Sequence, residues 1–210
     1  MRILKNLIIG LILLVGGVML LMLIPSPQAP ADKPWEVTVM PDGNSKVLGI
    51  HLGHTDYKTA QQQLGVFGET GLFVDPDGRR SIEAYFDSVN LAGLSAKLVL
   101  NLGVSEQQID DMLNRASAGE LQPSGAHQHE LAEIDRESLL TIPVTGLTYI
   151  PSVRLKPEML RSRFGEPASI EQSEADENGQ HTESWLYPDL GLSIVFQPEQ
   201  KPILIYRAKP

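Results

Sequence analysis

The sequence of 210 residues contains no cysteine. This absence excludes a disulfide-linked scaffold, cysteine chemistry at a catalytic or metal-binding site, and the lipid attachment of a lipoprotein. Basic residues are also few, because 17 Lys and Arg stand against 26 Asp and Glu, which gives a net charge of −9. This excess of negative charge argues against nucleic acid and against an anionic membrane surface as partners.

The short motifs of common catalytic sites are missing as well. The chain has no Gly-x-Ser-x-Gly, no phosphate-binding Walker loop and no Gly-x-Gly-x-x-Gly. The sequence therefore contains no motif that indicates a serine nucleophile of that type or a nucleotide cofactor. We expect no catalytic residues and no cofactor, and we expect that the protein is not an enzyme.

The chain does have one long apolar run. Residues Leu7–Ile24 carry no charge, and a helix of that length would span about 27 Å, close to the roughly 30 Å hydrocarbon core of a bilayer. Extension back to Ile3, with Lys5 reaching the interface, completes the span. We predict a transmembrane signal-anchor and a Pro-rich stalk over residues 1–31, with residues 3–24 in the membrane. A cleavable signal peptide is the alternative.

The charges around this run predict its orientation. Arg2 and Lys5 both precede it, which places the N-terminus in the cytoplasm. Residues 32–210 are then exported under either alternative. This exported part carries 15 basic and 26 acidic residues, so its net charge is −11. It is still rich enough in apolar residues to form a sizeable core.

We predict the α+β fold class, with an N-terminal transmembrane helix followed by two tandem helix-plus-antiparallel-sheet units. The first α+β unit covers residues 32–118 and the second covers residues 130–210. Residues 119–129 are rich in Gly, Pro, Ser and His and are expected to be a linker. Short extended stretches are expected over residues 131–134 and 139–144.

Local signals place several elements inside these units. The alternation over Trp35–Ile50, interrupted at Asp42–Asn44, predicts a β-hairpin. Asp56 is suited to begin a helix, and the segment Ser105–Gln108 has the form of a capping box for a second one. Pro157 fits the first turn of a third helix.

The second half of the chain repeats landmarks of the first at a distance of 100 residues. Leu64-Gly65 falls on Phe164-Gly165, and Glu83–Phe86 falls on Glu183–Leu186. The order of helix, glycine and extended segments is the same in both halves, which favours a tandem repeat. A single α+β domain with accidental similarity is the alternative.

These segments resemble the SmpA/OmlA module, and the tandem arrangement is similar to that of the β-lactamase inhibitory proteins. The matching segments of the second half are Phe164–Pro167, Trp185–Pro188, Gly191–Phe196 and Ile203–Tyr206. In the first half, Gly53–Thr55 followed by Leu64-Gly65 is similar to the helix entry and exit of the module. The resemblance implies a non-catalytic scaffold that binds proteins in the bacterial envelope. With the orientation above, it implies a single-pass inner-membrane protein with residues 32–210 in the periplasm.

Three aromatic residues are candidates for protein binding. Side chains alternate between the two faces of a strand, so Trp185 and Tyr187 share one face and Leu186 points to the other. If a helix covers the face that carries Phe86 and Leu186, then Tyr85, Trp185 and Tyr187 line an open sheet and can anchor a partner. Packing of these aromatic residues in the core is the alternative.

Two histidine pairs, His51 with His54 and His127 with His129, are candidates for metal ligands. A catalytic zinc site needs three protein ligands on a rigid frame. The second pair lies in the expected linker, so solvent-exposed polar residues are the favoured interpretation and no metal is expected.

The sequence thus favours a non-catalytic, inner-membrane anchored protein that binds another envelope protein through its periplasmic units. A periplasmic module that binds a small ligand, such as a lipid or glycan fragment, between the two units is the first alternative. A metal-dependent hydrolase that uses His51, His54, His127 and His129 is the second.

Overall fold

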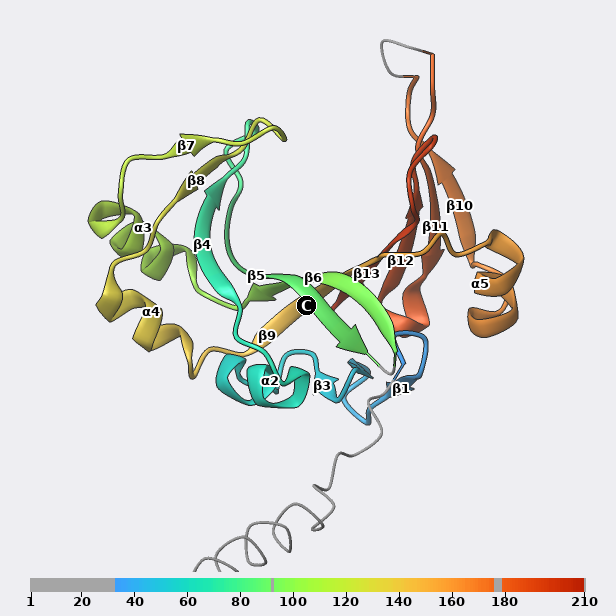
Figure 1. The fold of residues 1–210 in the computed structure, drawn as a ribbon, viewed down its shortest axis with the longest axis horizontal. Helices are drawn as coiled ribbons and strands as arrows, with labels where there is room; N and C mark the ends of the chain where they lie inside the picture. Colours follow the sequence, from blue (N-terminus) through green and yellow to red (C-terminus); the bar gives the residue numbers. More distant parts are fainter. Residues whose placement is uncertain (1–32, 92, 176–178, 210) are drawn as a thin grey trace, which may run out of the picture. The chain divides into compact units, whose positions relative to one another are not determined.

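The computed structural model of the protein describes residues 33–91, 93–175 and 179–209 (Figure 1). In these ranges the chain forms thirteen strands, four α-helices and one short 3-10 helix. The helices are α2 (Tyr57–Leu64), α3 (Glu106–Arg115), α4 (Glu133–Leu139), α5 (Pro157–Phe164) and the 3-10 helix η1 (Pro188–Leu190). The strands are β1 (Val37–Val39), β2 (Ser45–Val47), β3 (Ile50–His51), β4 (Glu69–Val74), β5 (Arg80–Leu91), β6 (Leu94–Leu102), β7 (Glu120–Leu121), β8 (His127–His129), β9 (Val144–Pro151), β10 (Ser169–Gln172), β11 (Glu183–Tyr187), β12 (Leu192–Phe196) and β13 (Ile203–Arg207).

Ten of these strands form one antiparallel sheet. Its order is β10-β11-β12-β13-β9-β6-β5-β4-β8-β7. The pairing of β6 with β9, and of β9 with β13, joins strands from the early and late parts of the chain in one hydrogen-bonded ladder. Figure 1 shows that this large sheet is curved, with β4, β8 and β7 at one end and β12, β11 and β10 at the other.

The predicted fold class is wrong in its architecture. The described residues are mostly β, and ten strands share one sheet instead of forming the separate sheets of two tandem α+β units. The physical reason lies in β6 and β9, which both bury alternate side chains on one face. Their backbone edges satisfy each other's hydrogen-bonding groups, which an isolated unit would leave to water.

The predicted transmembrane helix is no part of the described fold. No helix within residues 33–91, 93–175 and 179–209 is long and apolar enough to cross a membrane. The anchor and stalk predicted over residues 1–31, including residues 3–24, lie outside the described residues.

The region between the two predicted units also differs in detail. Residues 119–129, expected to be a linker, contain β7 and β8, and β8 pairs with β4. The extended stretch predicted over residues 131–134 is wrong, because helix α4 begins at Glu133. Two acidic residues in its first turn favour this helix through its dipole, and one of them, the buried Asp135, receives two hydrogen bonds from Arg115 of α3.

The three helices predicted from local signals are confirmed. Asp56 caps α2 by accepting a hydrogen bond from the backbone N–H of Thr59 at 2.7 Å. Ser105 and Gln108 form the predicted capping box at the start of α3. Pro157 occupies the first turn of α5. These helices begin where side chains or proline satisfy the free N–H groups of the first turn.

The predicted N-terminal hairpin is confirmed as well. β1 and β2 pair across a turn over residues 40–44, and β3 adds to β2 to complete a three-stranded sheet. Gly43 adopts a φ of 84°, a conformation that suits glycine at this turn. The hydroxyl of Ser45 donates to the carbonyl of Leu190 at 2.7 Å, which fixes this small sheet to η1.

The helices and the small sheet cover one face of the large sheet. Tyr187 of β11 contacts Phe164 of α5, and the buried hydroxyl of Tyr206 on β13 donates to the carbonyl of Pro34. Figure 1 shows α2, α3, α4 and α5 on the outer side of the curved sheet, and no described helix on its inner side. The core on the covered face includes Ile82, Leu98, Leu100, Leu147, Tyr149, Ile194 and Leu204.

Candidate functional site

The inner face of the large sheet, which no described helix covers, is the first candidate site; we call it the open face (Figure 1). Its side chains alternate with the buried core residues along each strand. One cross-strand row on this face, in which each residue pairs with the next, consists of Glu69, Tyr85, Val99, Thr148, Ile205, Ser193, Leu186 and Ser169.

Six aliphatic side chains lie on the open face over β6, β9, β13, β12 and β11. We call them the apolar patch: Val99, Ile150, Leu186, Val195, Ile203 and Ile205. All six are half-buried, although the residues beside them in sequence on the covered face are fully packed. Several partly exposed aliphatic side chains on one sheet face are typical of a surface that binds another molecule.

A small polar cluster lies beside the apolar patch on β5 and β6. The Tyr85 hydroxyl donates to Asp87 at 3.0 Å, and the Lys97 ammonium reaches both the Tyr85 oxygen at 3.0 Å and Asp87 at 2.8 Å. The hydrogen bond from Lys97 lowers the pKa of Asp87, and the same bond raises the pKa of Lys97. With the exposed Glu69 on β4, this end of the open face has more negative than positive charge.

Glu83 adds a further carboxylate to the same face. Burial raises the pKa of Glu83, and hydrogen bonds from Ser81 at 3.1 Å and Asn101 at 3.2 Å offset this only in part. Glu83 is half-buried on β5, so its ionised form is held in a partly desolvated position.

The structure separates the three aromatic residues singled out in the sequence. Tyr85 lies half-buried on the open face, whereas Trp185 is 2% exposed and Tyr187 is 6% exposed on the covered face. The guanidinium of Arg161 on α5 lies 4.4 Å from the Trp185 ring centre, and the Tyr187 hydroxyl donates to the Gly165 carbonyl. Trp185 and Tyr187 therefore take the core position that was the alternative.

The aliphatic residues of the open face were missed at the level of sequence, although one signal for them exists. Every residue of Ile203–Tyr206 is apolar, a pattern that fits a strand with nonpolar surroundings on both faces. In β13 one face packs in the core, and the other face, with Ile203 and Ile205, is covered by no described helix.

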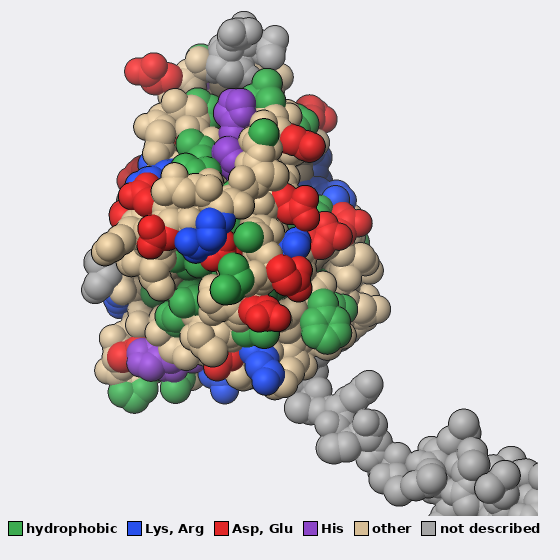
Figure 2. Space-filling view, turned by 90° about the vertical axis from the view of Figure 1, so that its left-hand side faces the viewer, with side chains coloured by type: hydrophobic (Ala, Val, Ile, Leu, Met, Phe, Trp, Pro, Cys, Tyr) green, Lys and Arg blue, Asp and Glu red, His purple; other side chains and the backbone are tan. Residues whose placement is uncertain are grey.

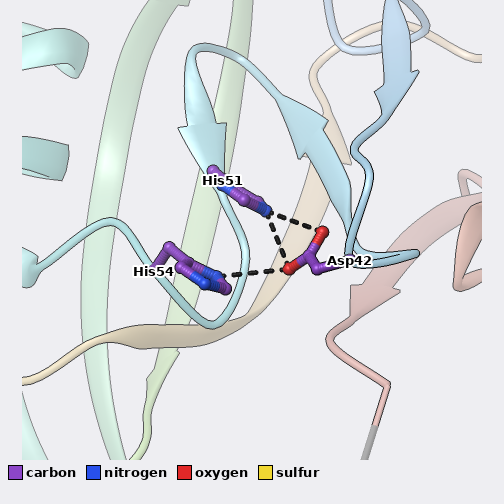
Figure 3. Close-up of side chains that lie close together, drawn as sticks. All are labelled: Asp42, His51 and His54. Atoms are coloured by element: carbon purple, nitrogen blue, oxygen red, sulfur yellow. Dashed lines mark hydrogen bonds and ion pairs between the residues drawn. The ribbon is translucent and has the colours of Figure 1, made fainter.

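A second candidate site joins the small sheet to the start of α2. Asp42 lies 3.1 Å from Nε2 of His51 and 3.3 Å from Nδ1 of His54, measured from its Oδ2 atom (Figure 3). The two imidazole rings are stacked, with centres 4.3 Å apart and planes inclined by 8°. Burial alone would raise the pKa of Asp42, but hydrogen bonds from Asn44 and His51 outweigh it and lower that pKa.

The other histidine pair does not join this cluster. His127 and His129 lie on β8 of the large sheet, while His51 lies on β3 and His54 in the turn before α2. Figure 2 shows histidine side chains at two well-separated places on one side of the molecule. The four histidines of the hydrolase alternative are therefore not brought together.

A cavity of about 520 Å³ lies beside the first half of β4. Its lining includes Glu69, Thr70, Gln128, Glu130 and Arg136, so most of its walls are polar. The guanidinium of Arg136 already donates to Glu130 at 3.2 Å. A lipid chain requires mainly apolar walls, so this cavity is a poor match for a lipid.

No protein-family model, no curated protein and no solved structure matches the chain. The resemblance to the SmpA/OmlA module stays a prediction from the sequence.

Proposed function

We propose that the protein is a non-catalytic component of the bacterial envelope and that its open face binds another protein. The observation that supports this proposal most directly is the apolar patch on a sheet face that no described helix covers. Burying aliphatic surface contributes about 25 cal/mol per Å², so the patch offers a favourable contact for a partner. A water-facing sheet usually carries polar side chains at such positions.

The charges around the patch define the chemistry of the partner. Exposed carboxylates lie at both ends of the open face, with Glu69 and Asp87 on β4 and β5 and Glu171 on β10. Lys97 offsets the charge of Asp87 in its ion pair, and the exposed Arg207 shares the face of Ile205 on β13. Glu69 and Glu171 therefore carry the negative charge at the two ends. The fitting partner presents an apolar centre surrounded by basic residues, because such a surface complements both features.

The location is the second part of the proposal, and it is supported by the sequence alone. The uncharged run Leu7–Ile24, preceded by Arg2 and Lys5, favours attachment to the inner membrane through residues 3–24. Residues 32–210 would then lie in the periplasm, where the partner would be another envelope protein.

Site-specific photocrosslinking in intact cells tests the binding role. A photoreactive residue at position 99 or 205 of the full chain should give one discrete crosslinked protein. The matched control is position 134, because Ile134 is 69% exposed on α4, away from the open face. Crosslinks of equal yield from all three positions, or none from 99 and 205, would contradict the proposal.

A second measurement, on the purified protein, distinguishes protein binding from the small-ligand alternative. Native mass spectrometry of the purified full chain should give the mass of the protein alone. A persistent additional mass of a lipid or glycan, with no crosslinked protein at position 99 or 205, would instead favour the binding of a small molecule.

A further inference from the structure

We propose that Asp42, His51 and His54 form a binding site for a divalent transition-metal ion of the Zn²⁺ type (Figure 3). The three side chains come from the β1–β2 turn, from β3 and from the turn before α2. One ligand atom from each lies within 4.8 Å of the other two. Such a site would tie the small sheet to the start of α2.

The kinds of ligand atom select the class of ion. Two imidazole nitrogens and one carboxylate oxygen are a donor set typical of zinc and of other first-row transition metals. Calcium and magnesium prefer sites made of oxygen atoms. The set of Asp42, His51 and His54 therefore points to an ion that accepts nitrogen ligands.

The distances between the donors also fit. A tetrahedral zinc site with bonds of 2.0–2.1 Å separates its donor atoms by about 3.3 Å. The Asp42 Oδ2 atom lies 3.1 Å from His51 Nε2 and 3.3 Å from His54 Nδ1. Three protein ligands leave one coordination position for water or for a side chain of a bound partner.

Hydrogen bonds around the cluster hold the ligands in place. The side-chain amide of Asn44 donates to Asp42 at 2.9 Å. The Oδ1 atom of the same Asn44 side chain accepts from the backbone N–H of Lys209 at 2.7 Å. Thr55 accepts from the backbone N–H of His51 at 2.9 Å. Contacts of this kind orient metal ligands and contribute to affinity.

Binding requires one rearrangement. The parallel imidazole planes do not let both ring nitrogens point at a shared ion, because a metal binds in the plane of each ring. His54 is 60% exposed, so its ring has room to turn about the Cβ–Cγ bond. Its 3.3 Å contact with Asp42 Oδ2 is then replaced by a bond to the ion.

The experiment uses the full chain, purified without a histidine tag and treated with EDTA before titration with Zn²⁺. Isothermal titration calorimetry should give one ion per chain. Asp42→Asn, His51→Ala and His54→Ala should each weaken binding by more than about 10-fold. The matched control is the double variant His127→Ala/His129→Ala, which removes the histidine pair on β8 and should bind as the wild type does.

Thermal unfolding gives an independent measurement. Zn²⁺ should raise the Tm of the wild type and of the control, and the shift should be clearly smaller in the three ligand variants, because an ion that binds the folded chain stabilises it in proportion to its affinity. A hydrogen-bonded cluster without metal affinity, seen as no stoichiometric binding or as equal loss in the control, would overturn the proposal. The open face uses other residues, so this result would leave the proposed protein-binding function untouched.

Discussion

Val99 and Ile205 lie on opposite sides of Thr148 in one row across β6, β9 and β13, because each of them pairs with that threonine. The three strands come from distant parts of the chain, so no single segment contains this surface. The apolar patch exists only when the central ladder of the sheet is formed. Binding through the open face therefore depends on the stability of the sheet.

The hydroxyl of Tyr206 connects the large sheet to the segment before β1. It donates to the Pro34 carbonyl at 2.6 Å in a buried position. Tyr206→Phe should leave that carbonyl without its partner and lower the free energy of unfolding by about 1–3 kcal/mol. Urea denaturation measures this value. Tyr85→Phe is the control: its hydroxyl is exposed to solvent on the open face, so the loss should be smaller. Equal losses would contradict the assigned role of Tyr206.

Substitution of Trp185 should mainly reduce stability, whereas substitution of Tyr85 should mainly reduce binding. Trp185 packs against Phe196 and beneath Arg161, so Trp185→Ala should cost about 3–5 kcal/mol of stability through the cavity it leaves. Tyr85→Ala should cost less than about 1 kcal/mol and should reduce crosslinking to the partner. Chemical denaturation and crosslinking yield measure the two effects. A stable Trp185→Ala protein that no longer binds would show that Trp185 acts in recognition instead.

Glu83 should make the stability of the protein depend on pH. Its pKa is raised by burial, so the folded chain holds the proton more tightly than the unfolded chain, and ionisation of this group costs stability. That cost is absent well below the ordinary pKa of about 4.3 and is complete above the raised value. Glu83→Gln should therefore stabilise the protein at pH 7 and have little effect at pH 3. Urea unfolding at both pH values checks this, and a gain at pH 3 alone would contradict it.

The acidic ends of the open face should control the rate of association. Glu69→Gln together with Glu171→Gln should slow association with the crosslinked partner by about 2- to 5-fold at low salt, and the difference should vanish near 0.5 M NaCl. Surface plasmon resonance measures these rates. Glu158→Gln, at an exposed position of α5, should have no effect. A rate that is independent of salt in the wild type would argue against a basic partner.

Local signals in the sequence predict local structure well. The cap at Asp56, the box at Ser105–Gln108 and the proline at 157 are all found at helix starts, because each signal acts within one turn. The architecture depends instead on the pairing of β6 with β9, which joins residues about 50 positions apart. No short pattern encodes such a pairing, and so the fold class was predicted incorrectly.

The residues of the candidate sites were also hard to predict, because they depend on contacts between distant segments. The similarity between Glu83–Phe86 and Glu183–Leu186 suggested that Tyr85 and Trp185 share a face, but the register of pairing places them on opposite faces. A shift of one residue in a strand reverses every side chain, so weak sequence similarity cannot fix the face. Asp42 was missed because only the folded turn brings it to His51, nine positions later.

Affinity measurements on two lysine variants test whether the open face binds the partner. Ile205→Lys places a charge in the apolar patch, and Ile134→Lys makes the same change at an exposed site on α4. With the partner identified by crosslinking, Ile205→Lys should raise the Kd by at least about 10-fold. Ile134→Lys should bind as the wild type does, and circular dichroism should show that both variants are folded. An unchanged Kd for a folded Ile205→Lys protein would contradict binding through the open face.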